Sequence, residues 1–430
     1  MESILAAGDD QLIPELSPNN YDSQASYVID RQQTQTVCPT PVLSSGGVRT
    51  ARFNIVDGNF LDLSTMWFSF VVRNNDGTEA HLLRPLSAIP HCWFRRAVIS
   101  LNGAVVDDVS FLARTEESIS RFVSLNKRTN WADAGHGYAT PETLAGNTGV
   151  PKTIAGGSAQ RVTWRPLSLG FLQASKYLPM LSGAGGGLSI SFELSDATDA
   201  CLGGDAANTS QDWQIEQMTC HVDSVTLTSE LTSAFAAQLE RGESILIPYQ
   251  ANSSDVQYVQ NGGQYTISMA KQFSRLATVF CSLGVADADT TVMTKSMNNF
   301  FLAQNSGNVG AQEVESWFTV NNKRFPQFNT QGTKQHLHRL IQATGTWNST
   351  SHAVNIGSVA YGDGSAAANM WMQATDLEAI PHSQASGMPV QGGGQIQIHL
   401  KNVGDASRVY IHCHFDACLE ITSQGAISYS

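Results

Sequence analysis

The chain has 430 residues, of which 42% are hydrophobic and 14% are charged, and its formal net charge is −12. This length exceeds what one hydrophobic core usually supports, so the sequence predicts two domains. The first thirty residues hold no Lys or Arg, and no apolar run is long enough to span a membrane, which excludes a basic nucleic-acid-binding arm and a transmembrane helix.

The N-terminal segment, residues 1–35, predicts an extended, weakly structured arm. Pro14, Pro18 and the Asn19-Asn20 pair interrupt any hydrophobic period there. The cysteines of the chain are scattered, odd in number and without a C-x-x-C pair. That pattern predicts unpaired, mostly buried thiols in a reducing compartment.

Strand patterns dominate residues 36–228. Apolar residues at helical spacing predict one helix over 110–125, and the stretch 127–160, rich in Gly, Thr and Asn, predicts a loop. The predicted strands are ARFNIV (51–56), STMWFSFVV (64–72), WFRRAVISLNG (93–103), AVVDDV (104–109), GGGLSISFEL (185–194) and MTCHVDSVTLTS (218–229). The two strands that meet at Asn102-Gly103 predict a hairpin.

A short helix is predicted over residues 229–242, capped by Ser229 and ended by Gly242, and it marks the expected domain boundary. Strand patterns restart after it, and long loops are expected within 285–392. The predicted strands of this half are ESILIPYQ (243–250), GGQYTISM (262–269), FSRLATVFCSLG (273–284), ESWFTVNN (315–322), GGGQIQIHL (392–400) and SRVYIHCHFDACLEIT (407–422).

Three strings of the first half recur in the same order in the second half. Phe94-Arg95-Arg96 is echoed by Phe273-Ser274-Arg275, GGGLSISFEL by GGGQIQIHL, and CHVDS (220–224) by CHFDA (413–417). Three ordered echoes predict a duplicated β-domain whose loops vary in length. Strand alternation then places His412, His414 and Asp416 on one face, toward a polar surface or a neighbouring subunit, with Cys413 and Phe415 toward a core.

Two longer stretches carry a resemblance to a known family. RNNDGTEAHLLRPLSAIPHCWFRRAVISLNGAVVDDVSFLARTEE (73–117) resembles a segment with an aromatic-x-Arg strand, an Asn-Gly turn and a following helix. VYIHCHFDACLEITSQGAISYS (409–430) resembles a closing strand pair. Together with the ordered echoes, over roughly 35–425, they resemble the double jelly-roll major capsid proteins of tailless icosahedral DNA viruses, a lineage that includes adenoviruses, virophages, polinton-like elements and large eukaryotic DNA viruses.

The resemblance implies an all-β fold of two tandem antiparallel eight-stranded jelly-roll sandwiches with short connecting helices and long loops. The arm would cover 1–35, the first jelly roll 36–228, the linker helix 229–242 and the second jelly roll 243–430. It also implies a non-enzymatic protein of the virion capsid, made and assembled in the host cell, with no catalytic residue, metal or cofactor.

The implied partners are further copies of the chain, first in a homotrimer shaped as a pseudo-hexameric capsomer and then in neighbouring capsomers. Penton proteins and minor or cement proteins would be further partners. Sequence-specific nucleic-acid binding is not expected, and the acidic arm does not indicate contact with an internal membrane.

The leading enzymatic alternative is a metal-binding bicupin, in which an H-x-H strand pair holds the metal. His412 and His414 with Glu420 come near that spacing, although the gap to Glu420 is longer than the cupin motif allows, and CHVDS holds only His221. A second pair, His336 and His338, falls in a segment that predicts a loop.

Two further alternatives are weaker. The doublets Asp107-Asp108 and Glu116-Glu117 could serve glycoside hydrolysis, but neighbours on a strand point to opposite faces, and solvated acids are the simpler interpretation. A single-jelly-roll capsid or adhesion protein would usually carry a basic arm, or a repeat-rich shaft, and would lack the echo in the second half.

Overall fold

The structure is a computed structural model. It describes residues 28–140, 149–180, 187–203, 208–259, 264–284, 313–346, 354–357, 361, 370–378, 387–390, 394–403, 408–423 and 425–429. The first 27 residues of the predicted arm and much of the predicted long loop 285–392 therefore lie outside the described residues.

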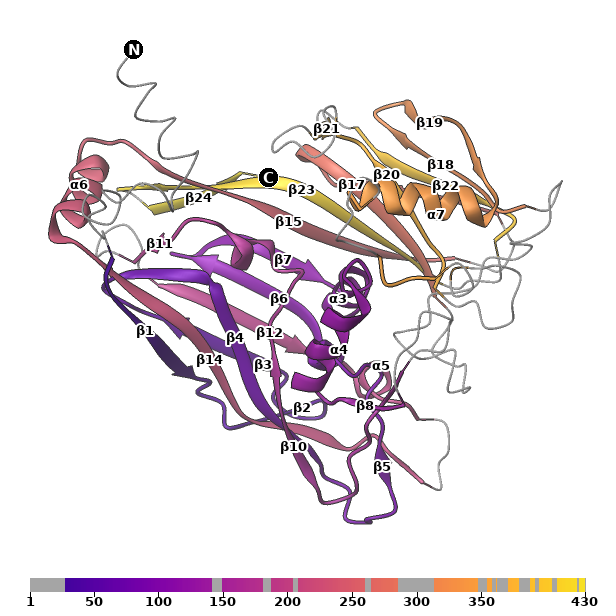
Figure 1. Cartoon of the computed structure of the whole chain (residues 1–430), viewed down its shortest axis with the longest axis horizontal. Helices are drawn as coiled ribbons and strands as arrows, with labels where there is room; N and C mark the ends of the chain where they lie inside the picture. The colour runs from indigo at the N-terminus through magenta and orange to yellow at the C-terminus, as the bar shows by residue number, and fades with distance from the viewer. Residues whose placement is uncertain are drawn as a thin grey trace, which may run out of the picture.

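The first half of the chain forms a sandwich of two antiparallel sheets (Figure 1). One sheet runs in the order β1 (Val28–Val37), β14 (Trp213–Leu227), β4 (Phe60–Asn74) and β10 (Ala159–Trp164), with β2 (Val42–Ser44) and β11 (Leu178–Pro179) at its flanks. The facing sheet runs in the order β3 (Thr50–Ile55), β12 (Leu188–Leu194), β6 (Phe94–Leu101) and β7 (Ala104–Ser110).

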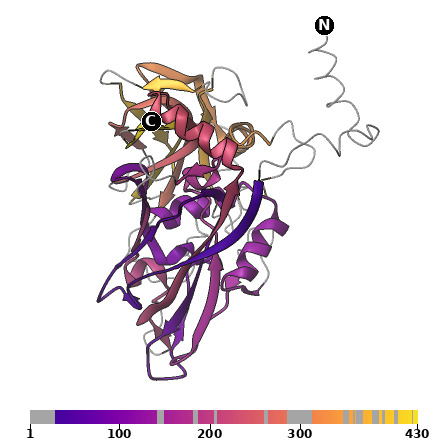
Figure 2. The same ribbon diagram turned by 90° about the vertical axis from the view of Figure 1, so that its left-hand side faces the viewer.

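The second half forms another sandwich with the same plan. One sheet has the order β15 (Ile245–Tyr258), β23 (Arg408–Thr422), β17 (Phe273–Gly284) and β20 (Met372–Asp376), with β21 (Met388–Val390) and β24 (Gly425–Tyr429) at its flanks. The facing sheet has the order β16 (Gln264–Met269), β22 (Ile396–Lys401), β18 (Glu315–Val320) and β19 (Lys323–Gln331). Figure 2 shows the two sandwiches as adjacent bodies, with most of the first in indigo to magenta and the second in salmon to yellow.

Short elements connect these strands. The helices are η1 (Pro90–Trp93), α3 (Leu112–Ser120), α4 (Leu125–Ala134), η2 (Gly170–Gln173), α5 (Ala197–Ala200), α6 (Ser229–Glu240) and α7 (Gly332–Ala343). The remaining short strands are β5 (Leu82–Leu83), β8 (Tyr138–Thr140), β9 (Val150–Pro151) and β13 (Thr209–Ser210).

The two sandwiches match strand for strand along the chain. β1, β3, β4, β6, β7, β10, β12 and β14 occupy the same sheet positions as β15, β16, β17, β18, β19, β20, β22 and β23. Each half is therefore a jelly roll, and the predicted all-β tandem fold is confirmed. A helix follows the same hairpin in both halves, since α3 comes after the β6–β7 hairpin and α7 after the β18–β19 hairpin.

The correspondence of strands between the two sandwiches shows which of the repeated strings lie in equivalent strands. CHVDS lies in β14 and CHFDA in β23, and GGGLSISFEL and GGGQIQIHL lead into β12 and β22, so both pairs occupy equivalent strands. The third echo is wrong, because Phe94 begins β6 whereas Phe273 begins β17, and the counterpart of β17 is β4. A buried Phe followed by an exposed Arg fits the start of many strands, so three residues cannot identify one.

The β6–β7 and β18–β19 hairpins show the duplication at the level of single turns. Asn102 and Gly103 close the first hairpin with φ of 53° and 84°, and Asn321 and Asn322 close the second with φ of 49° and 63°. Positive φ at both central residues is the type I′ geometry, which matches the twist of the flanking strands. Asn and Gly tolerate that geometry, so the predicted turn at Asn102-Gly103 is confirmed.

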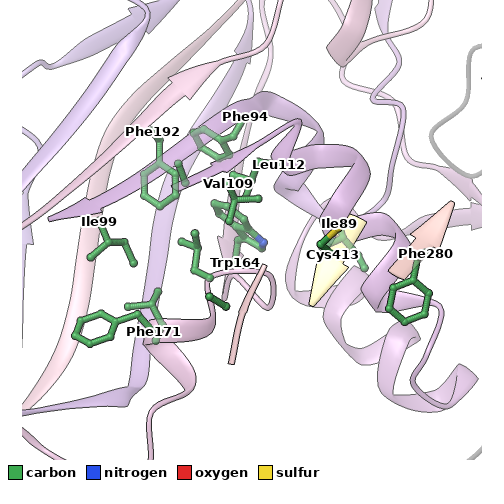
Figure 3. Packing of buried hydrophobic residues seen from close by; sticks show 14 of the residues in the cluster. Ile89, Phe94, Ile99, Val109, Leu112, Trp164, Phe171, Phe192, Phe280 and Cys413 are labelled. Carbon is green, nitrogen blue, oxygen red and sulfur yellow. The ribbon is translucent and has the colours of Figure 1, made fainter. Parts of the chain in front are cut away.

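Aromatic side chains fill the core of the first sandwich (Figure 3). Phe94 from β6 stacks on Trp164 from β10 with ring centroids 5.0 Å apart, and Phe68 meets Phe192 edge to face at 4.8 Å. Phe192 lies on β12, where burial alternates residue by residue as its sequence predicts. Buried contacts of this kind hold the two sheets together, at about 25 cal/mol per Å² of apolar surface.

Several local predictions need correction. The helix predicted over 110–125 is split into α3 and α4, and α4 occupies the start of the predicted loop 127–160. Residues 332–343, predicted as a loop around His336, form α7. β1 begins at Val28 and pairs with β14, so strand structure starts inside the segment that the sequence assigns to the arm.

Helix α6 lies between β14 and β15, as the sequence predicts, but its N-cap residue is Thr228 and not the predicted Ser229, which is the first residue of the helix. Leu231 and Phe235 pack on Phe60 and Val225 in a small apolar cluster, and Gly242 takes a φ of 80° just after the helix. The helix thus packs on the end of the first sandwich. The predicted domain boundaries themselves stay a prediction.

Candidate functional site at the joint between the sandwiches

The two sandwiches meet in a contact that we call the joint. It is formed by β7, α3 and η2 of the first sandwich and by β15, β17, β23 and β24 of the second (Figure 1). At its centre the backbones touch, because a Cβ added at Gly170 in η2 would lie 1.5 Å from the carbonyl oxygen of Gln250 in β15. Only glycine allows this approach.

Side chains of β15 bind backbone groups of the first sandwich. The Tyr249 hydroxyl donates to the Val106 carbonyl at 2.7 Å, and the Asn252 amide donates to the Ser168 carbonyl at 2.6 Å. The Ser254 hydroxyl donates to the Ser110 carbonyl. These bonds satisfy carbonyls that the packing removes from water, and each contributes about 1 kcal/mol.

Rings from the two sandwiches also pack against each other. Phe122, just after α3, stacks on Phe280 of β17 with centroids 4.9 Å apart. Phe171 of η2 meets Tyr249 edge to face at 5.3 Å. The Arg114 guanidinium lies 4.9 Å from the centre of the Tyr410 ring.

His414 of CHFDA and His412, just before that string, lie at this joint rather than on a polar surface. His412 is 1% exposed, and its Nδ1 lies 3.2 Å from the Thr115 hydroxyl of α3. Burial, with a contribution from Arg114 and His414, lowers the pKa of His412 to about 3, so its ring is neutral at pH 7. The predicted alternation of faces is correct, but the neighbour is the other half of the same chain.

Behind the joint, Glu117 of α3 is fully buried in a cluster of ion pairs. Its carboxylate lies 2.8 Å from Arg121 and 2.5 Å from Arg128, and 3.0 Å from His91 Nε2. Burial acts to raise the pKa of Glu117, but Arg128, Arg121 and His91 outweigh it and hold the pKa well below its usual value. The prediction of a solvated acid is wrong here.

The two other buried carboxylates, Glu116 and Asp107, bind backbone N–H groups instead of cations. Glu116 is buried and accepts hydrogen bonds at 2.7 Å from the backbone N–H groups of Leu167 and Ser168, and burial raises its pKa. Asp107 is buried, accepts the Phe171 N–H at 3.2 Å, and has its pKa raised by burial to about 7.

Asp108 points to the opposite face of β7, as predicted, and pairs with Arg96 at 2.6 Å on the surface. The prediction of solvated acids therefore holds for Asp108 but is wrong for Asp107, Glu116 and Glu117. The buried carboxylates bind backbone N–H groups and cationic side chains. These contacts hold the segments that follow β7 on the first sandwich.

The candidate metal residues do not come together. His412 faces α3, His414 lies 4.8 Å from the ring of Phe280, and Glu420 hydrogen-bonds Ser244 and Tyr429. In the part of the chain that the structure describes, no three His, Cys, Asp or Glu side chains are grouped to hold an ion.

The second pair is also separated. His336 is buried and bonds Ser316 at 2.6 Å and the Gly332 carbonyl at 2.6 Å, whereas His338 lies on the exposed side of α7. Burial lowers the pKa of His336 to about 4. His336 therefore anchors α7 to β18.

A cleft of about 790 Å³ opens beside the joint, between η2 and the strands β15, β17, β23 and β24. Its lining mixes polar residues of both sandwiches, among them Gln173, Gln250, Arg275 and Asp416. Within the described residues, no helix is long and apolar enough to cross a membrane.

The structure is similar to those of viral capsid proteins. The Faustovirus major capsid protein matches with a TM-score of 0.63 at 10% sequence identity, over 93% of this chain and 92% of that one. The PBCV-1 capsid quasi-atomic model matches with a TM-score of 0.60 at 12% identity, over 95% and 98%. The fold is the double jelly roll.

A further double jelly roll, in the cryo-EM structure of the Sputnik virophage, matches with a TM-score of 0.55 at 13% identity, over 96% of this chain and 91% of that one. No protein-family model and no curated protein sequence matches the chain. The likeness thus lies in the double jelly-roll fold, which extends over nearly the whole of each chain.

The sequence did not single out the residues that lock the joint. Gly170, Asn252 and Thr115 carry no motif, and each acts through a partner at least 80 residues away in the chain. The one available signal was the helix pattern after β7, which placed an apolar face there without showing what it packs against.

Proposed function

We propose that the protein is a non-enzymatic major capsid protein that trimerises into pseudo-hexameric capsomers and builds an icosahedral virus shell. The observation that carries this proposal is one chain holding two jelly rolls of the same topology, held side by side by the joint. Three such chains supply six similar sandwiches, which suits a ring of pseudo-sixfold symmetry.

The likeness to capsid protein structures supports the same function. It extends over at least 91% of each of the three capsid structures compared above, so the likeness covers both jelly rolls and their arrangement. The low charged fraction of 14% also suits a surface that is covered by copies of itself, because charged groups are depleted at the centres of interfaces.

Its partners are then other copies of the chain, first in the trimer and next between capsomers, followed by penton and minor or cement proteins. Its place is the virion capsid, after synthesis and assembly in the host cell. Burial of apolar rims drives the trimer, while contacts between capsomers are weaker so that misplaced trimers can leave.

Mass measurement and negative-stain microscopy of the purified full chain test this function. We expect particles of three chains with a hexagonal outline. A protein that stays a monomer at high concentration, or that purifies with stoichiometric bound metal as a monomer or dimer, would contradict the proposal and favour the bicupin.

A further inference from the structure

We propose that a pocket in the first sandwich binds a phenol, a single aromatic ring that carries a hydroxyl group. The pocket has a volume of about 150 Å³ and is lined by residues of β4, η1, α3, α4 and β10, with the segment that follows β10. All of these elements belong to one sandwich. The inference therefore goes beyond the proposed capsid function and does not depend on it.

The size and the walls of the pocket fit one aromatic ring. An apolar cavity of about 150 Å³ is large enough for one benzene molecule. Indole side chains contribute to the lining from three elements, Trp67 from β4, Trp131 from α4 and Trp164 from β10. Such walls favour a flat ligand, because contacts between rings add to the burial of apolar surface. Ala134 and Arg165 of the lining are exposed, so the pocket can be reached from the solvent.

Two buried rings of the lining keep a nitrogen without a partner. Trp164 is 3% exposed and His91 is 0% exposed. Trp164 Nε1 and His91 Nδ1 have no hydrogen-bond partner in the part of the chain that the structure describes. In Figure 3 the Trp164 nitrogen, drawn in blue, lies on the side of its ring that faces Ile89, another residue of the lining. A buried polar group without a partner is unfavourable, so both nitrogens favour a ligand with a polar group.

The chemistry of these two nitrogens selects a hydroxyl group. Trp164 Nε1 can only donate, so it needs an oxygen that accepts. His91 Nε2 lies 3.0 Å from the ionised Glu117 carboxylate, which can only accept, so Nε2 carries a proton. His91 Nδ1 is then an acceptor in the neutral imidazole and a donor in the charged one. A hydroxyl group suits both forms, because it donates one hydrogen bond and accepts two, whereas a carbonyl group only accepts.

The charged groups of the lining are already bound to other parts of the protein. Glu116 accepts the backbone N–H groups of Leu167 and Ser168, each at 2.7 Å. The Arg165 guanidinium donates to the Gln173 side-chain oxygen at 2.9 Å. Because neither charge is left for a ligand, a carboxylate or an ammonium group would lose its hydration without gaining a counter-charge. The lining therefore favours an uncharged phenol over an aromatic acid or amine.

The position of the pocket gives a bound phenol a structural effect. Its walls join β10, a strand of the sandwich, to α3 and α4, and α3 is part of the joint. A ring between these elements adds contacts that the folded chain alone can make. Binding to the folded state stabilises it in proportion to the logarithm of ligand excess, so we expect the phenol to raise the melting temperature.

Fluorine NMR of the purified full chain tests the site with two probes, para-fluorophenol and fluorobenzene, which differ in the hydroxyl group alone. We expect para-fluorophenol to bind about tenfold more tightly, since only its hydroxyl group can bond the buried nitrogens. Trp164→Phe keeps an aromatic wall and removes the N–H donor. We expect this variant to reduce the preference for para-fluorophenol to about threefold or less.

Trp213→Phe is the matched control. Trp213 is 1% exposed and its Nε1 also has no partner among the described residues, but it does not line the pocket. We expect this variant to keep the full preference for para-fluorophenol. A loss of preference in Trp213→Phe as large as that in Trp164→Phe would place the bound probe elsewhere and overturn the inference.

Three further results overturn it. These are equal affinity of the two probes, a preference that survives Trp164→Phe, and no binding of para-fluorophenol at millimolar concentration, which leaves water as the occupant. Should Trp164→Phe melt far below the wild type, Ala134→Leu, at an exposed position of the lining, replaces it. We expect Ala134→Leu to weaken the binding of both probes about tenfold, because a larger side chain fills part of the pocket. Unchanged affinities in that variant contradict the site.

A phenol ring can come from a free small molecule or from a tyrosine side chain of another protein. Competition between para-fluorophenol and N-acetyltyrosine amide distinguishes these two sources. Displacement of the probe supports a phenol site that also admits a tyrosine side chain. A probe that stays bound supports a site for the free molecule, since the pocket then has no room for the peptide groups attached to the ring.

Discussion

The closing strands β14 and β23 carry nearly the same string, CHVDS and CHFDA, in different surroundings. In β14, His221 stacks on Trp67 on a half-exposed face. In β23, the matching His414 lies 4.8 Å from the Phe280 ring, and His412, two residues earlier, is buried against Thr115 of the other sandwich. The string determines which side chains point into the core, and the neighbouring sandwich determines what the others meet.

The helices α3 and α7 show the same difference. Both follow an equivalent hairpin, but α3 is held by a buried cluster around Glu117, whereas α7 is anchored by His336 through Ser316 and its own backbone. One fold was thus used twice, and the joint was built only on the copy that meets a neighbour within the chain. The predictions below test that difference, beginning with the largest effect.

We expect the substitution Glu117→Gln to lower the free energy of unfolding by about 3–5 kcal/mol at pH 7, because it leaves two buried arginines without their counter-charge. The folded pKa of Glu117 lies below 4.5, so its contribution is complete above about pH 4.5 and is lost as the pH falls through the folded pKa. In urea unfolding, the difference in unfolding free energy between the variant and the wild type should therefore become smaller at acid pH.

Glu240→Gln, at an exposed position on α6, is the matched control for Glu117→Gln. We expect it to change stability by less than about 0.5 kcal/mol. A Glu117→Gln protein as stable as this control would show that the cluster does not hold α3 in place.

We expect Gly170→Ala to destabilise the protein by about 3 kcal/mol, since its methyl group would meet the backbone of β15 and no side chain can move aside. Gly77→Ala is the control, because a Cβ there has open space. Thermal unfolding measures both. Equal melting temperatures for Gly170→Ala and Gly77→Ala would mean that the sandwiches separate easily and that the joint is not rigid.

The pair His412→Ala and His221→Ala compares one outward-facing histidine from each closing strand. Removing His412 leaves a cavity at the joint and removes its contact with the Thr115 hydroxyl, which keeps its bond to the Phe111 carbonyl. We expect this to cost about 2 kcal/mol. Removing His221 loses one half-exposed ring contact, which costs about 1 kcal/mol or less. Chemical unfolding of the monomeric forms measures both values, and the reverse order would contradict the assignment of the two faces.

At pH 4, Asp107→Asn is expected to have the smallest effect of these variants, below about 1 kcal/mol, and the difference from the wild type then grows by up to about 1.4 kcal/mol for each pH unit. The folded pKa of Asp107 is raised from 3.8 to about 7, so the wild type loses stability as the pH rises between these values. Asn keeps an acceptor for the Phe171 N–H and carries no charge. The free energy of unfolding of the variant, relative to that of the wild type, should therefore rise from pH 4 to pH 7. If the two free energies instead run parallel over this pH range, Asp107 does not ionise in the folded protein between these pH values.

Patterns that depend on local alternation and turn chemistry could be predicted from the sequence. The strands at 185–194 and 407–422 and the turn at Asn102-Gly103 follow from which side chains must be buried and which residues accept positive φ. The Phe94 echo failed because three residues do not identify a strand. The buried Glu116 and Glu117 were missed because burial of an acid depends on partners such as Arg128, which arrive from another segment.

The sequence by itself determined two β-domains in tandem, because inside/outside alternation and the repeated strings CHVDS and CHFDA are properties of each strand alone. Only the tertiary structure decided that η2 and α3 dock on β15 and β23, and that the Glu117 carboxylate is buried among cations. Those contacts join residues such as Gly170 and Gln250, whose meeting depends on how two finished sandwiches fit together. A shape complementarity of that kind has no period and no motif along the chain.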